Sequence, residues 1–298
     1  MQIRKQQLDL DMEQQTGSIK RKKEGRLTRI NWSGRRFMLE NTVSSNSVLL
    51  IGAGNLATSL GVALVKAGYV PVAVWSLTVE SASELGKHLN CPYSNDMSQL
   101  PQAATVIVSV VDSALPIVAR DVARLFPDSL VLHTAGSVSV DVLRTAGCRK
   151  YGVLYPMQTF SKVKCVDFST VTTFVEGCDD EAAAFIRDMA LRLGGKVFDA
   201  TSKQRKYLHL AAVFACNFSN AMYAMSAQLM QKHGLPFEAL LPLIDETANK
   251  VHRLTPSQAQ TGPARRGDKE IMALHSSMLD EELRGVYTML SEYIMNHK

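Results

Sequence analysis

The feature that most constrains the fold is a strand, a glycine turn and a helix that follow one another from residue 47. Residues 47–51 (SVLLI) form an almost wholly apolar run, which is typical of a strand buried on both faces of a parallel sheet. The turn Gly52-Ala53-Gly54 follows, and a helical pattern then extends from Asn55 to Lys66 before Ala67-Gly68 ends it. A strand of this kind needs helices on both sides, so an α/β domain is predicted.

Strand and helix patterns alternate after this segment. Strands are expected at Val70–Trp75, near Cys91–Tyr93 and at Thr105–Val111, Leu130–His133 and Tyr151–Tyr155, with helices at Ser81–Leu89, Leu115–Leu125 and Val140–Thr145. Such alternation predicts a Rossmann-type parallel sheet covered by helices, because each crossover returns across one side of the sheet. A further strand, helix and strand at Thr172–Val175, Glu181–Leu193 and Lys196–Asp199 extend the pattern.

The C-terminal third is expected to be all-α. Three long helices are predicted at Lys203–His233, Phe237–Leu254 and Asp268–Asn296, and the loop between the last two holds two prolines and two glycines. We therefore predict a Rossmann domain over residues 46–200 and a helical substrate and dimerisation domain over residues 201–298. A division near residue 165 is the alternative.

The basic excess of the chain lies in its first 40 residues. The formal net charge is +5, but residues 1–40 hold ten Lys or Arg and five Asp or Glu, which leaves 23 of each in residues 41–298. This segment has little apolar periodicity, so residues 1–45 are interpreted as a disordered or over-extended leader, with Met38 as an alternative start. An arm for nucleic acid or a membrane surface is the less favoured alternative. The neutral body predicts neither partner.

The cysteines indicate a reducing compartment. The five cysteines include no C-x-x-C pair, and their odd number leaves at least one unpaired, so we predict a cytoplasmic protein without a metal site. No apolar run reaches the roughly 18 residues that span a bilayer, and the N-terminus lacks a secretory signal. Hydrophobic residues make up 46% and charged residues 20% of the chain, as in globular proteins.

The glycine turn carries the first functional signal. Gly52–Ala57 fits the pattern G-x-G-x-x-A, in which the first glycine permits a tight turn, the second lets a pyrophosphate approach and the small third residue lets helix and strand pack closely. The amides and dipole of the helix N-terminus favour the phosphates. We predict that Gly52, Gly54, Asn55 and Leu56 bind a dinucleotide. A purely structural turn is the alternative.

The end of the second strand bears on the choice of cofactor. NAD enzymes place an Asp or Glu there for the ribose hydroxyls, and none is present at Trp75-Ser76-Leu77-Thr78. Ser76 and Thr78 can bond a 2′-phosphate without repelling it, which favours NADP. The preference is mild because no arginine stands beside them, so NAD stays possible.

Polar residues follow three later strands, at the edge where parallel sheets bind ligands. Predicted cofactor contacts are Val110, Val111, Asp112 and Thr134, and predicted substrate contacts are His133, Ser137 and Gln158. Two of these have plain structural alternatives. Asp112 could cap the next helix, and His133 could be packed at the edge of the sheet.

A polar stripe is expected along the long helix from Lys203. At 100° per residue Lys206, His209, Asn217 and Asn220 fall within about 80° of one another, among apolar neighbours. His209 could give a proton to a forming alkoxide or amine and Asn217 could orient a carbonyl, so His209, Asn217 and Lys206 are the predicted catalytic residues, facing a cleft between the domains. A hydrogen-bond network between helices or at a dimer interface is the alternative.

The loop Gln260–Asp268 offers a cationic group. Arg265 and Arg266 stand in a rigid segment bounded by Gly262-Pro263 and Gly267, where an arginine could bind a carboxylate or phosphate with two hydrogen bonds. Arg265 is therefore a predicted substrate contact. Alternatively, Asp268 caps the next helix and Arg266 is a solvated neighbour.

These motifs together resemble a known family. The chain resembles bacterial two-domain proteins with a Rossmann-like domain and a helical C-terminal domain of unknown function, related to pyrroline-5-carboxylate reductase, deazaflavin-dependent NADP oxidoreductase and ketopantoate reductase. The resemblance rests on Gly52–Ala57, His133–Ser137, Tyr155–Ser161, His209 with Asn217, and Thr261–Asp268. It implies NAD(P) binding and a homodimer formed through the helical domain. Leu77, where these relatives often carry arginine, and Tyr155, where histidine is common, depart from the pattern.

The expected function is hydride transfer. An oxidoreductase would use NADPH to reduce a small carbonyl or imine held between the domains, with 2-keto acids and cyclic imines as the open choices. A regulatory or scaffold protein that binds NADP without turnover is the alternative from another class.

Overall fold

The computed structural model describes residues 43–297. Apart from residues 43–45, the predicted leader lies outside the described part of the chain. The chain forms two compact units, of which the first ends at Ala212 and the second begins at Val213. This division lies later than the predicted boundary at residue 200, and each unit is described by itself.

The first unit is built on one eight-stranded sheet of order β3-β2-β1-β4-β5-β6-β7-β8. Its strands are β1 (Ser47–Ile51), β2 (Val70–Trp75), β3 (Tyr93–Ser94), β4 (Thr105–Val108), β5 (Leu130–His133), β6 (Lys150–Met157), β7 (Thr172–Gly177) and β8 (Lys196–Asp199). The order reverses between β1 and β4, which is the switch point where doubly wound sheets bind ligands. The predicted Rossmann-type class is confirmed.

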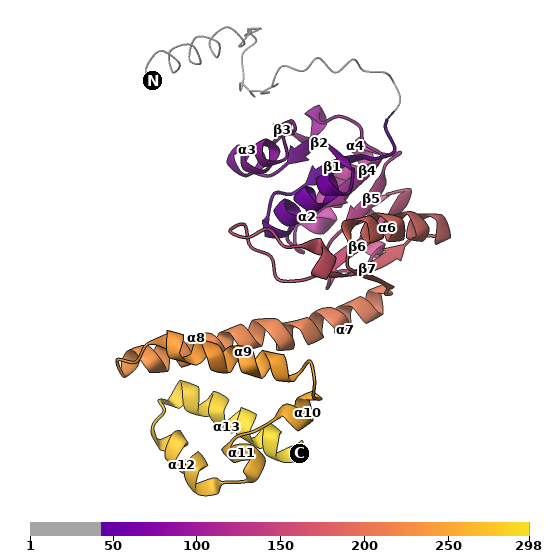
Figure 1. Cartoon of the computed structure of the whole chain (residues 1–298). Helices are drawn as coiled ribbons and strands as arrows, with labels where there is room; N and C mark the ends of the chain where they lie inside the picture. Colours follow the sequence, from indigo (N-terminus) through magenta and orange to yellow (C-terminus); the bar gives the residue numbers. More distant parts are fainter. Residues whose placement is uncertain (1–42, 298) are drawn as a thin grey trace, which may run out of the picture. The chain divides into compact units, whose positions relative to one another are not determined.

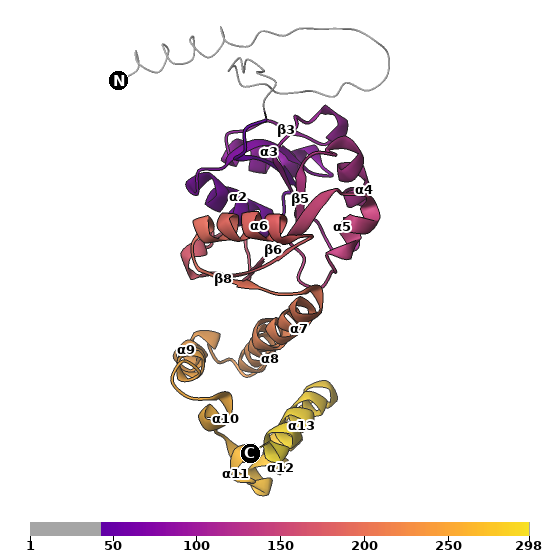
Figure 2. The same ribbon diagram turned by 90° about the vertical axis from the view of Figure 1, so that its right-hand side faces the viewer.

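Helices cover both faces of the sheet, with α2 and α6 on one side and α4 and α5 on the other (Figure 2). Their bounds are α2 (Asn55–Lys66), α3 (Val79–His88), α4 (Leu115–Leu125), α5 (Asp141–Ala146) and α6 (Asp180–Leu193), with short 3-10 turns at Met97–Gln99 and Phe168–Thr170. The strand β1 contributes to the apolar core on each face of the sheet, because Val48 and Leu50 face α2 while Leu49 and Ile51 face the α4 side.

The sheet departs from the all-parallel expectation at β7, which pairs antiparallel with β6. The connection between them, residues 158–171, contains only a 3-10 turn and no crossover helix, and a parallel pair needs such a crossover. The strand β4 also ends at Val108 rather than Val111, so the polar residues after it begin a loop.

The helical part is more broken than predicted (Figure 1). The helix α7 (Ser202–Ala212) ends the first unit, and a π-helical stretch (Val213–Phe218) begins the second. The remaining helices are α8 (Ser219–Lys232), α9 (Leu241–Lys250) after a 3-10 turn (Phe237–Leu240), α10 (Pro256–Ala259), α11 (Pro263–Arg266), α12 (Lys269–Ser277) and α13 (Glu281–Asn296). The long helices predicted at residues 203–233 and 268–296 are therefore each interrupted.

The break between α12 and α13 has a local cause. The carboxylate of Asp280 accepts a hydrogen bond from the Leu283 amide and caps α13. Arg284 then closes the turn by donating to the carbonyl oxygens of Ser276 and Leu279. These bonds satisfy carbonyls at the end of α12 that have no partner inside the helix.

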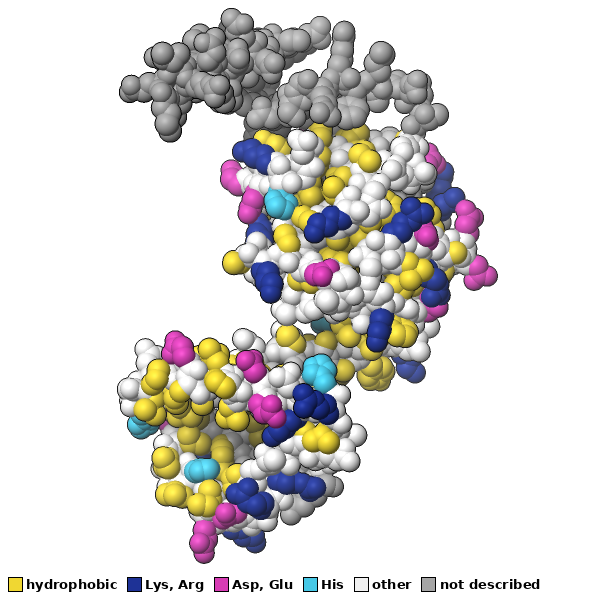
Figure 3. All heavy atoms as spheres, in the orientation of Figure 1, with side chains coloured by type: hydrophobic (Ala, Val, Ile, Leu, Met, Phe, Trp, Pro, Cys, Tyr) yellow, Lys and Arg dark blue, Asp and Glu magenta, His cyan; other side chains and the backbone are white. Residues whose placement is uncertain are grey.

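The second unit buries very little apolar surface of its own. Within residues 213–297, Ala264 is the one hydrophobic residue in the buried class. Large apolar side chains are instead exposed, and Figure 3 shows them gathered on the visible face of this unit. They include Leu241, Leu243, Leu254, Leu274, Met278, Met289 and Tyr293. Exposed apolar surface of this extent is typical of sites where another molecule binds.

Candidate functional site

The turn after β1 is fixed by its first glycine. Gly52 has a φ of +114°, and a Cβ at this position would lie 2.0 Å from the carbonyl oxygen of Ser109. No other residue fits there, because both the backbone conformation and the contact exclude a side chain. The turn is therefore held directly beside the end of β4.

The N-terminus of α2 is open to a ligand. Gly54 is the exposed N-cap of α2, its helix has no side-chain cap and no acidic residue in the first turn, and a Cβ on Gly54 would meet nothing within 4 Å. Asn55 donates from Nδ2 to the carbonyl oxygen of Phe160 at 3.1 Å, and Leu56 packs against the core. Free amides without a nearby carboxylate fit a diphosphate.

Residues after β2 are partly occupied by structural roles. Thr78 is the N-cap of α3, and its hydroxyl accepts from the Ser81 amide at 3.4 Å. The amide of Ser76 donates to the carbonyl oxygen of Ser94. The Ser76 hydroxyl makes no described hydrogen bond within residues 43–297. Leu77 is 80% exposed. The structure thus leaves Ser76 as the freer hydroxyl for a cofactor.

The loops after β4 and β5 meet at the same edge. The hydroxyl of Ser137 donates to the carboxylate of Asp112. Val110 packs against the core, whereas Val111 is 71% exposed, and Thr134 is buried. Asp112 precedes α4 without capping it, since the N-cap Ala114 makes no side-chain bond. Asp112 and Ser137, which follow β4 and β5, are therefore brought together at this edge of the sheet.

His133 does not face the surface, which corrects its predicted role as a substrate contact. Its side chain is fully buried, and Nδ1 accepts the Ala135 amide at 3.1 Å. Burial lowers the pKa of His133 to about 3, with a further lowering by the Arg205 cation. The imidazole is therefore neutral at physiological pH, and it shapes the turn after β5.

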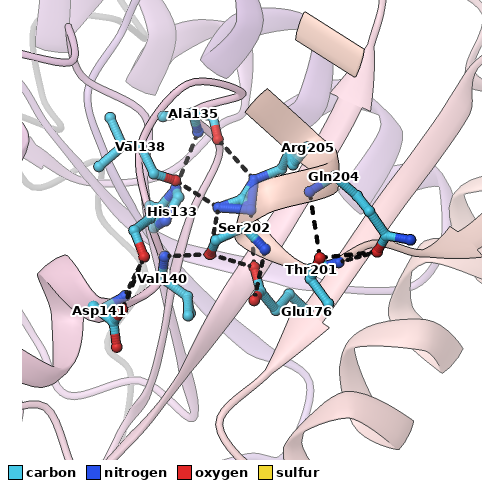
Figure 4. A network of polar contacts seen from close by, with 11 residues as sticks. His133, Ala135, Val138, Val140, Asp141, Glu176, Thr201, Ser202, Gln204 and Arg205 are labelled. Carbon is cyan, nitrogen blue, oxygen red and sulfur yellow. Dashed lines mark hydrogen bonds and ion pairs between the residues drawn. The ribbon is translucent and has the colours of Figure 1, made fainter. Parts of the chain in front are cut away.

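A buried cation that the sequence did not single out holds this turn. Arg205 on α7 is fully buried, and its guanidinium donates to the carbonyl oxygens of Ala135 (3.2 Å) and Val138 (2.5 Å) and to the Glu176 carboxylate (2.8 Å). Ser202 joins the same network through Glu176 (Figure 4). Burial lowers the pKa of Arg205, and Glu176 opposes that shift. The network ties α7, β7 and the turn into one body.

His209 lies one helical turn beyond Arg205 and contacts β6. Its Nδ1 is 3.3 Å from the hydroxyl of Tyr155, and a Cβ on Gly136 would lie 2.8 Å from the same Nδ1. Lys206, the neighbouring predicted catalytic residue, is exposed, and its side chain has no hydrogen bond or ion pair to any residue between 43 and 297. Of the three predicted catalytic residues, His209 is the one the structure places against strand-end residues of the sheet.

The predicted polar stripe does not continue through the second unit. Asn217 lies in the π-helical stretch and Asn220 in α8, and both are exposed. A π-helix bonds each residue to the fifth one along and so turns less per residue than an α-helix, which moves Asn217 and Asn220 off the α-helical angles of Lys206 and His209. The prediction of the stripe assumed a constant 100° per residue, which the π-helical stretch does not follow. Arg265 is half-buried in α11 without a described partner.

The loop after β6 holds the last predicted substrate contact of the first unit, and a hollow lies at the other end of its sheet. Gln158 is exposed, and its Oε1 accepts the Thr159 amide. A hollow of about 440 Å³ lies beside Ala104, Leu130 and Lys150. These residues begin β4, β5 and β6 or precede them, so the hollow lies at the opposite end of the strands from the glycine turn. Residues 43–297 hold no cluster of three metal-ligating side chains.

The fold and the open helix N-terminus define a two-domain protein whose first domain has a Rossmann fold of nucleotide-binding type. One family model, a Rossmann-like domain, matches residues 40–154, and another, a domain of unknown function called DUF2520, matches residues 171–294. The chain belongs to the family of proteins that join these two domains.

Solved structures support this membership. A provisionally assigned NADP oxidoreductase from Bacteroides fragilis is 46% identical and superposes with a TM-score of 0.81 over 85% of this chain and 100% of that chain. A protein from Thermotoga maritima is 21% identical (TM-score 0.64, 84% and 97% covered), and a pyrroline-5-carboxylate reductase from Coxiella burnetii is 17% identical (TM-score 0.54, 84% and 96% covered). The last two show a shared fold.

No protein of curated function matches the sequence. Within residues 43–297, none of the helices combines the length and the apolar character that a membrane crossing requires.

The Arg205 network generates a stability prediction. Replacing Arg205 with Met should lower the free energy of unfolding by about 3–5 kcal/mol, because the largely buried carboxylate of Glu176 and two carbonyl oxygens lose their partner. The exposed pair of Arg187 with Asp199 is the control, and Arg187→Met should cost less than about 1 kcal/mol. Urea unfolding followed by Trp75 fluorescence in a Trp32→Phe background measures both. Equal costs for the two variants would contradict the structural role.

Proposed function

We propose that this protein is an NAD(P)-dependent oxidoreductase that transfers a hydride between NADPH and a small carbonyl or imine substrate. One observation carries the proposal: an uncapped helix N-terminus at Gly54 and the pair of His209 and Tyr155 lie at the same edge of one sheet. The strands β1 and β6 are separated there by β4 and β5 only, which amounts to about 15 Å at roughly 4.8 Å per strand. A dinucleotide is long enough to connect these positions.

Different residues bind the cofactor, donate the proton and orient the substrate in this proposal. Gly52, Gly54 and the first amides of α2 hold the diphosphate, with Asp112 and Ser137 nearer the reacting end. The bound nicotinamide supplies the hydride. His209 gives a proton to the oxygen or nitrogen of the substrate, while Asn217, Lys206 and Arg265 are proposed to orient the substrate and to hold its charge.

NADP is the proposed cofactor. Residues 75–78 at the end of β2 contain no carboxylate that would repel a 2′-phosphate, and Ser76 has a hydroxyl free to bond one. Thr78 contributes less than the sequence suggests, because its hydroxyl caps α3. The five cysteines, all free, suit the cytoplasm that we propose as its location.

Binding is tested at Gly54. Its backbone (φ −79°) suits any residue, and a methyl group would meet no protein atom, so Gly54→Ala should leave stability unchanged. A diphosphate on the helix N-terminus would meet that methyl, and the affinity for NADPH should fall roughly tenfold or more, a loss of about 1.4 kcal/mol. Fluorescence titration with NADPH and NADH measures it, with Gly285→Ala in α13 as the control. The site would be refuted if the unmodified protein showed no saturable binding, or if Gly54→Ala and Gly285→Ala bound NADPH equally well.

The alternative function is a regulatory or scaffold protein that binds NADP without turnover. His209→Ala separates the two. If His209 supplies a proton, turnover of small carbonyls and imines by the variant should fall about 10²-fold or more, while NADPH affinity stays unchanged. Lys203→Ala, at an exposed position of the same helix α7 that has no role in the proposed chemistry, is the control. Oxidation of NADPH that is as fast in His209→Ala as in the unmodified protein would remove His209 from the chemistry.

The helical unit is proposed to form a homodimer. Its exposed apolar side chains cannot be buried within residues 213–297, and a second copy of the chain is a partner that is always present at equal concentration. Leu243 and Leu274, which are 64% and 55% exposed, belong to this surface.

Sedimentation tests the dimer. Leu243→Glu combined with Leu274→Glu should produce monomers or a less stable helical unit, because two buried charges would have no partner at the interface. Leu191→Glu, at a 56% exposed position on α6, should leave the dimer intact. An unmodified protein that sediments as a monomer at micromolar concentration would overturn this proposal.

A further inference from the structure

The contact between Tyr155 and His209 is closely confined. The Tyr155 hydroxyl lies 3.3 Å from His209 Nδ1, and the two rings stand at 64° to each other. The Tyr155 side chain comes from β6 and is largely buried, at 8% exposure of the residue, whereas His209 on α7 is half-buried. The inner nitrogen of His209 thus faces the tyrosine, and Nε2 is the nitrogen left for other partners.

A glycine makes this contact possible. A Cβ on Gly136 would lie 2.8 Å from both His209 Nδ1 and Tyr155 Cζ. The backbone of the turn therefore presses against the two groups that share the hydrogen bond. Arg205 holds this turn through the carbonyls of Ala135 and Val138, so the position of the pair depends on the same buried network.

The charges around Tyr155 keep its hydroxyl protonated. Burial raises the pKa of Tyr155, the Arg205 cation lowers it, and the Asp112 carboxylate raises it. The hydroxyl therefore holds a proton at neutral pH that it can donate to Nδ1. A neutral imidazole that accepts at Nδ1 carries its own proton on Nε2.

We propose that Tyr155 is a positioning residue that fixes His209 in the tautomer with its proton on Nε2. Tyr155 also gives its own proton to Nδ1 when the Nε2 proton leaves. The inference rests on the proposed function. As the substrate carbon accepts hydride from a reduced nicotinamide, the bond from the substrate oxygen or nitrogen to the Nε2 proton forms while the Nε2–H bond breaks. The Nδ1–H bond forms as the Tyr155 O–H bond breaks, and the negative charge passes to the phenolate. Solvent then returns one proton to the pair.

Arg205 gives this relay its electrostatic support. A phenolate at Tyr155 would carry its charge near a buried guanidinium that is already fixed by Glu176, so no side chain has to reorganise to stabilise it. Packing alone would not require the hydroxyl, because the contact of the Tyr155 ring with Phe174, at 6.4 Å between centroids, is available to phenylalanine as well.

The test is the tautomer of His209, measured by NMR on the full chain labelled with 15N in its histidine rings, with and without NADP. The unmodified protein should show His209 protonated at Nε2, and Tyr155→Phe should lose this preference and give a mixture. Tyr207→Phe, on the same helix but 66% exposed, should behave like the unmodified protein. Gly136→Ala should also lose the preference, because its methyl group separates the two rings.

Two results would overturn the relay. One is a His209 that carries its proton on Nδ1 in the unmodified protein, and the other is a tautomer ratio that Tyr155→Phe leaves unchanged. Should Gly136→Ala fail to fold, the Tyr155→Phe spectrum decides. The NADPH titration of Gly54→Ala reports separately on the proposed function, so a lost cofactor site and a lost relay give different results.

Discussion

The buried guanidinium of Arg205 is the interaction on which the candidate site depends. Removing a cation from water is costly. It is tolerated here because a carboxylate balances the charge of Arg205 and also accepts its hydrogen bonds, as two carbonyl oxygens do. These partners come from β7 and from the turn after β5, so one side chain fixes the direction of α7 relative to the sheet. His209 follows four residues later on the same side of the helix, so the contacts of Arg205 also fix the position of His209.

The two ends of the proposed site have different physical characters. At Gly54 the chain offers bare amides and a helix dipole, which suit an anion and require only that side chains be absent. At β6 the chain offers a protonated phenol, an imidazole and a buried cation, which suit the movement of a proton. Because β1, β4, β5 and β6 are parallel neighbours, both ends lie at one edge of the sheet.

Local patterns predicted the Rossmann half well because its strands are buried on both faces and its helices carry their own end signals. The bounds of β1, α2, β2 and α4 follow the apolar runs in the sequence, and glycines mark the ends of β1 and α2. The helical half was predicted less well. A π-helical stretch and the Asp280 cap interrupt helices whose apolar periodicity continues across the breaks, and periodicity alone does not record which carbonyl each amide finds.

The sequence by itself determined the glycine turn after β1, because the pattern G-x-G-x-x-A between an apolar strand and a helix is local and Gly52 has the positive φ that the turn requires. It also determined that His209 could exchange a proton. Only the tertiary structure decided that Arg205 is buried while Lys203 and Lys206 are exposed, since this depends on which side of α7 packs against the sheet. Tyr155 gained its partner for the same reason: residues 54 positions apart meet only once the sheet and α7 have packed together.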